Sequence, residues 1–296
     1  MSDAILSSTP MRAAASLSEP GFAVPAGTCD SHVHVFESEA RYPHVAKPHY
    51  TLPDGGASKL DAMTRALGID RFAIVQPSFY GTDNRCMLDA LLHFGTARAR
   101  GVAMIDDDVS DDALDAMHAR GVRALRLDLF LRAQWPVAET LAYIARSAAR
   151  VGRLGWHLQF YTPGYVVRDL IPTLGDISCD FVIDHMGYML ESDGLTRADF
   201  DRLLAAMQRG RGWMKLSGPY RVAKDGNFEK LRPLAHAIVD ALGDRTVWGS
   251  DWPHIPKGEM DTGTLLALLG DWVPDAAARN RILSTNPARL YGFDAT

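Results

Sequence analysis

The sequence predicts an α/β protein folded as a (β/α)8 barrel, the TIM-barrel class. Three observations predict it: short apolar segments alternate with helix-like segments, there are eight such apolar segments, and 296 residues are enough for eight strand–helix units. A doubly wound open sheet is the alternative. That fold usually carries a glycine-rich phosphate loop after its first strand, and CDSHVHVFES at 29–38 contains no glycine. The barrel is therefore favoured.

The expected elements follow one another from residue 28 to the C-terminus. The expected strands cover 28–35, 71–78, 100–106, 122–129, 155–161, 180–187, 213–218 and 245–251. The expected crossover helices cover 58–68, 83–95, 110–121, 137–152 and 228–243. Several of these begin at Asp or Ser and end at Gly, which are the residues typical of helix starts and ends. In a barrel of this kind, active sites lie at the carboxyl ends of the strands.

The first 25 residues are small and polar, and prolines interrupt them. They lack the basic and apolar regions of a signal peptide, so we expect an N-terminal arm over 1–25. No linker or low-complexity block divides the remainder, which predicts one barrel domain over 26–296. No apolar run reaches the ~18–20 residues needed to span a bilayer, so we expect no membrane association and a cytoplasmic location.

The composition excludes some partner classes. An apolar content of 47% and a charged content of 23% are typical of globular proteins, and the formal net charge of −5 gives no basic excess for nucleic acid. Cys29, Cys86 and Cys179 are too few and too scattered for a disulfide framework, so we expect free thiols. The sequence does not determine the oligomeric state.

The segment CDSHVHVF at 29–36 carries two histidines one residue apart. Because side chains alternate along a strand, His32 and His34 should share one face with Asp30. A hydrogen-bonded histidine pair at a strand end is the alternative to a functional site. Further polar residues gather at the expected strand ends: Gln76, Ser78, Arg126, Asp128, Arg132, Tyr161, Asp184, His185, Lys215, Ser217, Arg221, Asp251 and His254. Such a concentration at a barrel mouth predicts an active site.

The side-chain types at this mouth indicate hydrolytic chemistry. Asp251 can accept a proton from water and so make the water nucleophilic. His32, His34 and His185 can polarise a carbonyl, either by donating hydrogen bonds or by holding a divalent metal. Three histidines and Asp251 would suffice as zinc ligands, and the sequence leaves both routes open. No GxSxG motif is present, so covalent catalysis is not favoured.

Three arginines bear on the substrate. Arg126 and Arg132 flank the end of the expected strand 122–129, and Arg221 follows 213–218. Guanidinium groups pair well with carboxylates and similar oxyanions, so an anionic substrate is expected. Exposed loop positions are the alternative for Arg132 and Arg221.

The motifs DSHVHVF, QPSFYGTDN, VRALRLDLFLR, FVIDHMG, MKLSGPYR, WGSDWPH and TNPARLYGF together resemble the lactonase branch of the amidohydrolase superfamily. The resemblance runs from about residue 25 to the end. It implies an amidohydrolase-like TIM barrel in which four residues bind a metal or activate a carbonyl: His32, His34, His185 and Asp251. Some members of the branch use one divalent ion, zinc or manganese among them, and others act without a metal. Both remain open for this chain.

The resemblance also implies a substrate class. Six residues occupy positions that hold substrate carboxylates in this branch: Tyr50, Ser78, Arg126, Arg132, Tyr161 and Arg221. The expected function is thus hydrolysis of a small anionic ring lactone resembling 2-pyrone-4,6-dicarboxylate, with water activated by Asp251. Opening of 4-sulfomuconolactone or a sugar-acid lactone is the nearest alternative.

Two positions depart from the pattern of the branch. Asp128 stands where an asparagine is expected and Tyr80 where a histidine is expected, and each could reshape the pocket. Two further functions are considered: a metal-dependent decarboxylase of an unsaturated acid, and a catalytically silent binder of small carboxylates. The silent binder is disfavoured, because it needs no base at Asp251.

Overall fold

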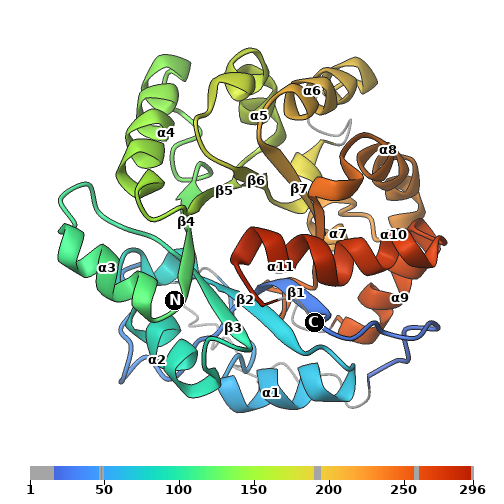
Figure 1. Ribbon diagram of the computed structural model, residues 1–296, viewed down its shortest axis with the longest axis horizontal. Helices are drawn as coiled ribbons and strands as arrows, with labels where there is room; N and C mark the ends of the chain where they lie inside the picture. The colour runs from blue at the N-terminus through green and yellow to red at the C-terminus, as the bar shows by residue number, and fades with distance from the viewer. Residues whose placement is uncertain (1–16, 47, 49, 190–194, 257–259, 295–296) are drawn as a thin grey trace, which may run out of the picture.

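The computed structural model describes residues 17–46, 48, 50–189, 195–256 and 260–294. Its eight strands form one sheet in which each strand is hydrogen-bonded in parallel to the next along the chain, and helices lie around the outside (Figure 1). The strands are β1 Cys29–Val33, β2 Arg71–Val75, β3 Ala99–Ala103, β4 Val122–Asp128, β5 His157–Tyr161, β6 Phe181–Ile183, β7 Gly212–Ser217 and β8 Thr246–Gly249. The predicted TIM barrel is confirmed.

The sheet closes where β1 meets the chain that follows β8. Val33 forms a parallel bridge with Trp252. The backbone N–H of Asp251 donates to the carbonyl of His32 at 2.8 Å, and the N–H of His34 donates to the carbonyl of Trp252 at 2.8 Å. These bonds join the two segments that carry predicted catalytic residues, so barrel closure itself brings them together.

Helices connect successive strands. The crossover helices from β1 to β6 are α1 Ala57–Ala66, α2 Arg85–Phe94, α3 Asp111–Ala119, α4 Val137–Gly152 and α5 Gly164–Leu170. Those that follow are α6 Arg197–Arg209, α7 Pro219–Val222, α8 Arg232–Leu242, α9 Thr262–Trp272, α10 Ala276–Asn280 and α11 Asn286–Tyr291. Short 3-10 turns lie between some of them, including η1 Ser78–Tyr80, η2 Ile171–Asp176, η3 His185–Tyr188, η5 Phe228–Leu231 and η6 Gly243–Arg245; the segment η7 Arg281–Thr285 is a π-helix.

Most expected elements begin or end one to three residues from the observed bounds, and two differ by more. The helix expected over 228–243 begins as the 3-10 turn η5 and becomes α8 at Arg232, because Pro233 has no N–H to donate and is tolerated in the first turn of a helix. The strand expected over 180–187 ends at Ile183. His185, with φ 52°, adopts a left-handed conformation that cannot continue a strand, so its side chain extends from the turn η3.

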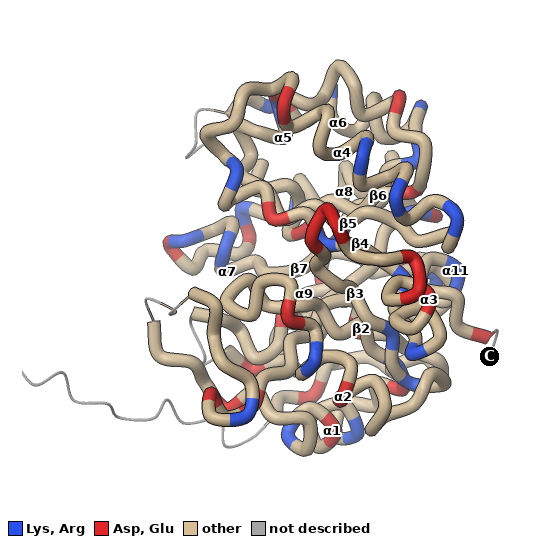
Figure 2. The backbone as a smooth tube through the Cα atoms, turned by 90° about the vertical axis from the view of Figure 1, so that its left-hand side faces the viewer, with Lys and Arg blue, Asp and Glu red and all other residues tan. Residues whose placement is uncertain are grey.

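The two ends of the barrel differ. At the amino ends of the strands, Tyr291 and Phe293 pack against interior side chains such as Ala73 and Ala124. The Tyr291 hydroxyl donates to the carbonyl of Ser31 at 3.2 Å. In Figure 2, α11 lies at this end and α7, which follows β7, lies at the other, while acidic and basic residues are interspersed along the chain. The filled amino end leaves the carboxyl end for polar chemistry.

The described part of the expected N-terminal arm packs on the barrel. Leu17, Phe22 and Val24 contact the apolar core, and the N–H of Ser18 donates to Asp261 Oδ2 at 2.8 Å. Residues 1–16 of the expected arm lie outside the described residues, and the division at residue 25 stays a prediction.

Cys29, Cys86 and Cys179 are free thiols, as expected. Among the helices that the structure describes, none combines the length and apolar character required to cross a membrane.

Candidate active site

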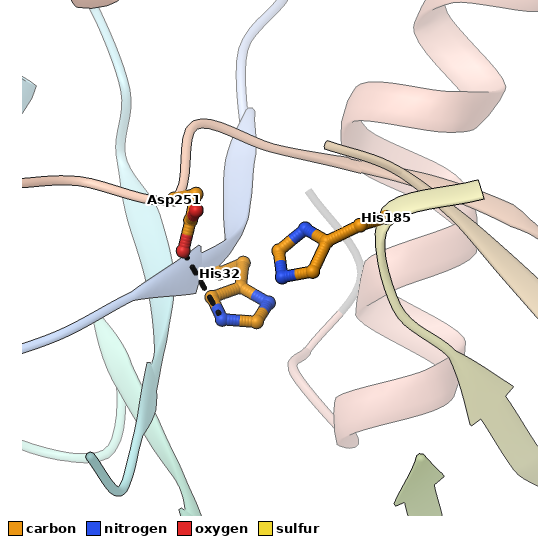
Figure 3. Close-up of side chains that lie close together, drawn as sticks. All are labelled: His32, His185 and Asp251. Atoms are coloured by element: carbon orange, nitrogen blue, oxygen red, sulfur yellow. Dashed lines mark ion pairs between the residues drawn. The ribbon is translucent and has the colours of Figure 1, made fainter. Parts of the chain in front are cut away.

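Four predicted catalytic residues meet at the carboxyl end of the barrel. The rings of His32 and His34 lie 5.0 Å apart between centroids, and that of His185 lies 4.9 Å from His32. Asp251 Oδ1 lies 3.6 Å from His32 Nε2 and 3.4 Å from His34 Nε2. Figure 3 shows the His32 ring between Asp251 and the His185 ring. All four side chains are buried.

Local backbone geometry positions these side chains. The pairing of β1 with β2 shifts register between Asp30 and Val33, and Asp30 Oδ1 accepts the N–H groups of His32 (3.1 Å) and Ser250 (2.9 Å). Asp30 therefore binds backbone beside the site, whereas His32 and His34 do converge as strand alternation predicts. Asp251, with φ 62°, is left-handed like His185. Such conformations cost of order 1–3 kcal/mol in a non-glycine residue and are concentrated at functional sites.

The two oxygens of Asp251 have different surroundings. Oδ2 accepts the Tyr220 hydroxyl at 2.6 Å and the Arg221 Nε–H. Oδ1 faces the two imidazoles and has no hydrogen-bond donor among the described residues. Burial opposes ionisation, but the Arg221 guanidinium beside it holds the pKa of Asp251 well below its usual range. Asp251 is thus a buried carboxylate with one oxygen held and one directed at the histidines.

A second buried ion pair lies beneath the histidines. Lys215 Nζ lies 2.9 Å from Asp184 Oδ1 and 3.3 Å from His32 Nδ1. Asp184 Oδ2 accepts Gln159 Nε2–H at 3.0 Å. Burial lowers the pKa of Lys215; burial opposes ionisation of Asp184, yet the Lys215 charge holds the pKa of that carboxyl well below its usual range. The site thus contains two ion pairs, Arg221 with Asp251 and Lys215 with Asp184.

Sequence reasoning placed Lys215 and Asp184 at strand ends without a role, and it missed Gln159 and Tyr220. Alternation along β5 was a usable signal for Gln159, because it shares parity with Tyr161. Tyr220 had a weaker signal, its place next to Arg221 in the loop after β7.

Burial keeps the histidines neutral near pH 7. It lowers the pKa of His32 and His34, and lowers that of His185 to about 4. The Nδ1–H of His34 donates to the carbonyl of Val75 at 2.8 Å, so neutral His34 presents a lone pair at Nε2. His185 Nδ1 lies 2.9 Å from Ser217 Oγ.

Part of this cluster fits a metal ion. Ligand atoms of His32, His185 and Asp251 lie within 4.8 Å of one another. His32 Nε2 and Asp251 Oδ1 are buried without a hydrogen-bond partner among the described residues. Imidazole nitrogen and carboxylate oxygen are ligands that zinc accepts. His34 was expected in the same ligand set, but it lies outside this group although it contacts Asp251.

A cavity of about 820 Å³ opens beside the cluster. Aromatic side chains supply much of its lining, together with Arg221; they are Phe130, Tyr161, Tyr165, Tyr188 and Tyr220. The Arg126 guanidinium lies 4.5 Å from the centroid of the Tyr161 ring, and its Nη1–H donates to the carbonyl of Gln76 at 3.1 Å. The half-buried Tyr50 belongs to the same region: burial raises the pKa of its phenol while the Arg221 charge opposes the rise.

Ser78 and Arg132 are engaged with another residue, Asp128. The Ser78 hydroxyl donates to Asp128 Oδ2, and Arg132 Nη1–H donates to the backbone carbonyl of Asp128 at 3.0 Å. The Arg132 guanidinium also lies 4.6 Å from the centroid of the Tyr143 ring. Neither side chain lines the aromatic cavity, so their predicted contact with substrate stays a prediction.

The two departures from the branch pattern have structural roles. The Asp128 carboxylate accepts the Ser78 hydroxyl and the N–H of Leu131, the latter at 3.2 Å, so its negative charge is not paired with Arg132. The buried Tyr80 hydroxyl accepts the N–H of Glu37 at 3.3 Å.

The family described as Amidohydrolase matches residues 29–293, nearly the whole barrel. The chain belongs to the amidohydrolase family. It is 32% identical to a 2-pyrone-4,6-dicarboxylate hydrolase of Comamonas testosteroni over 93% of each chain. It is 31% identical to a 4-sulfomuconolactone hydrolase of Hydrogenophaga intermedia, covering 92% of this chain and 90% of that one.

A solved amidohydrolase structure from Burkholderia multivorans contains bound zinc. It matches this structure with a TM-score of 0.70 at 22% identity, covering 91% of this chain and 100% of that one. This likeness concerns the fold, and the zinc is a property of that protein.

Proposed function

We propose that this amidohydrolase opens a small anionic ring lactone with a water molecule activated by Asp251. The observation that carries the proposal is the asymmetry of Asp251: Arg221 and Tyr220 hold Oδ2, while Oδ1 is directed at the histidines at the barrel mouth. A carboxylate so held is oriented to take a proton from one direction. The names of two relatives, both lactone hydrolases, support the same reaction class.

The proposed reaction uses this chain's own groups. Asp251 Oδ1 takes a proton from water, and the water oxygen bonds to the lactone carbonyl carbon. The carbonyl π electrons move onto its oxygen, which N–H groups of the histidine cluster stabilise. Collapse re-forms the carbonyl and breaks the bond between the acyl carbon and the ring oxygen. Asp251 returns its proton to that oxygen, so the product is an open-chain hydroxy acid whose new carboxyl group releases its proton to water.

The anionic groups of the substrate are assigned to the arginines. Arg126 lies over the Tyr161 ring, and Arg221 contacts Asp251 and lines the aromatic cavity. Guanidinium groups favour carboxylates and sulfonates geometrically. Tyr161 and Tyr50 complete this binding region. Ser78 and Arg132 are proposed to contact substrate only after exchanging their present contacts with Asp128.

A divalent ion, zinc or manganese, is compatible with the proposal. His32, His185 and Asp251 would hold it, with His34 adjacent. Such an ion supplies Lewis-acid polarisation of the lactone carbonyl when bound.

The test follows the ultraviolet absorbance of 2-pyrone-4,6-dicarboxylate with purified, chelator-treated protein. A falling absorbance supports the substrate class and hydrolysis without added metal, and the Asp251→Asn variant provides the matched control. If absorbance falls only after zinc or manganese is restored, the metal-assisted form holds. If it never falls, sulfonated and sugar-acid lactones are tested next. The proposal would be overturned if none of these lactones is hydrolysed, or if CO2 is released without ring opening.

A further inference from the structure

The Nδ1 atom of His32 lies beside one hydrogen-bond donor and one hydrogen-bond acceptor. Lys215 Nζ lies at 3.3 Å and Asp184 Oδ1 at 3.4 Å, and all three side chains are buried. An ammonium group only donates hydrogen bonds, whereas a carboxylate only accepts them. A single ring nitrogen can satisfy one of the two, so this contact determines which nitrogen of neutral His32 carries the proton.

Other contacts favour the lysine as the partner of Nδ1. Both oxygens of Asp184 already have a polar neighbour: Oδ1 forms an ion pair with Lys215 Nζ at 2.9 Å, and Oδ2 accepts Gln159 Nε2–H at 3.0 Å. Lys215 has three N–H groups, and its ion pair with Asp184 Oδ1 lacks hydrogen-bond geometry. With a lone pair at Nδ1, His32 accepts one of these N–H groups at 3.3 Å.

The opposite edge of the ring agrees with this assignment. His32 Nε2 lies 3.6 Å from Asp251 Oδ1, which has no hydrogen-bond donor among the described residues. A proton on Nε2 points a donor at that carboxylate, whereas a lone pair there would face negative charge. His34 has the reverse arrangement, because its Nδ1–H is used by the carbonyl of Val75.

We propose that Lys215 is a positioning residue that holds His32 in the tautomer with its proton on Nε2. His32 then presents a hydrogen-bond donor at the barrel mouth and withholds the lone pair that a metal ion requires. The buried ammonium thus favours hydrogen-bond activation of the carbonyl over metal binding. The catalytic meaning of this donor rests on the proposed lactone hydrolysis, but the tautomer itself does not.

The tautomer is measured directly by long-range proton–nitrogen correlation on chelator-treated protein labelled with ¹⁵N-histidine, with His32 assigned from the His32→Gln variant. The wild-type ring is expected to show a protonated Nε2 and an unprotonated Nδ1. In Lys215→Met the proton is expected to move to Nδ1, where Asp184 accepts it. Trp213→Phe is the matched control: Trp213 also lies inside the barrel on β7, in the separate apolar cluster with Val182 and Val247, and should leave His32 unchanged.

Zinc uptake gives a second readout. In equilibrium dialysis with zinc chloride, Lys215→Met is expected to bind the ion about 10-fold or more tightly than wild type. Changes to residues that hydrogen-bond metal ligands have effects of this size on metal affinity. Lys215→Arg should bind zinc about as tightly as wild type. A wild-type ring protonated on Nδ1 overturns the proposal even if Lys215→Met fails to fold. Unchanged tautomer and zinc affinity in a folded Lys215→Met also overturn it. Neither measurement needs turnover, so an Nε2-protonated His32 in a protein inert to lactones refutes only the proposed function.

Discussion

At the scale of the single residue, Asp251 shows how burial and pairing define one reactive atom. Its Oδ2 is occupied by Tyr220 and Arg221, and its Oδ1 faces His32 and His34. Asp251→Asn replaces a proton acceptor by an amide of nearly the same shape. We expect kcat for the lactone to fall about 10³-fold, within the usual range for a lost general base.

The measurement for Asp251→Asn is initial rate against lactone concentration, together with a melting curve to show that the variant folds. Asp225→Asn provides the control, since that half-exposed carboxylate pairs with Lys230 away from the histidines. A kcat within tenfold of wild type would remove Asp251 from the role of base.

Arg126 tests the charge of the substrate. Its guanidinium is buried beside Tyr161, and its Nε–H has no partner among the described residues. Arg126→Met is expected to raise KM about 10- to 100-fold, because a charge-assisted hydrogen bond contributes roughly 1.5–3 kcal/mol. Arg146→Met on the exposed face of α4 should leave KM unchanged. An unaltered KM in Arg126→Met would mean that another group holds the anion.

At the scale of the element, the contact between β8 and β1 depends on Gly249. A Cβ atom there would lie 2.6 Å from His32 Cβ and 2.8 Å from His32 N, closer than unstrained atoms approach. Gly249→Ala is therefore expected to lower the free energy of unfolding by about 1–3 kcal/mol and to impair turnover, because His32 must move. Gly243→Ala has no atom within 4 Å of its new Cβ and is the control. Urea unfolding curves compare them; equal stability of both variants would contradict the tight closure.

At the scale of the whole molecule, buried histidines make stability depend on pH. Burial lowers the pKa of His157 to about 3 and those of His185 and His254 to about 4. These rings stay neutral in the folded protein, whereas the unfolded chain takes up protons below about pH 6.5. The free energy of unfolding is therefore not reduced by these rings near neutral pH. It falls as the pH drops from about 6.5 to 4, by about 1.4 kcal/mol per pH unit for each ring.

The depressed pKa values of Asp184 and Asp251 act in a lower window. Their contribution is present above the ordinary carboxyl pKa of about 3.9 and is lost only as the pH falls further. Urea unfolding at pH 7, 6 and 5 measures the histidine window. His254→Gln should reduce the slope of the free energy of unfolding against pH by the contribution of one titrating ring. A stability that stays constant from pH 7 to 5 would show that these rings are not kept neutral.

The fold was largely predictable because a parallel barrel repeats one local pattern. In the sequence, each buried strand is a short apolar run and each crossover helix is an amphipathic segment. All eight predicted strands are present in the structure. The misplaced boundaries have local causes that the apolar pattern does not contain: the left-handed backbone at His185 shortens β6, and Pro233 divides η5 from α8.

The sequence by itself determined the number and order of the strands, the shared face of His32 and His34, and the side-chain types at the strand ends. These follow from alternation over a few residues. Only the tertiary structure decided the pairings: Arg221 with Asp251 and Ser78 with Asp128, and Lys215 with His32 across 183 positions of chain. The physical reason is that a strand's own pattern determines where its side chains point, whereas barrel closure determines which charges and lone pairs they meet.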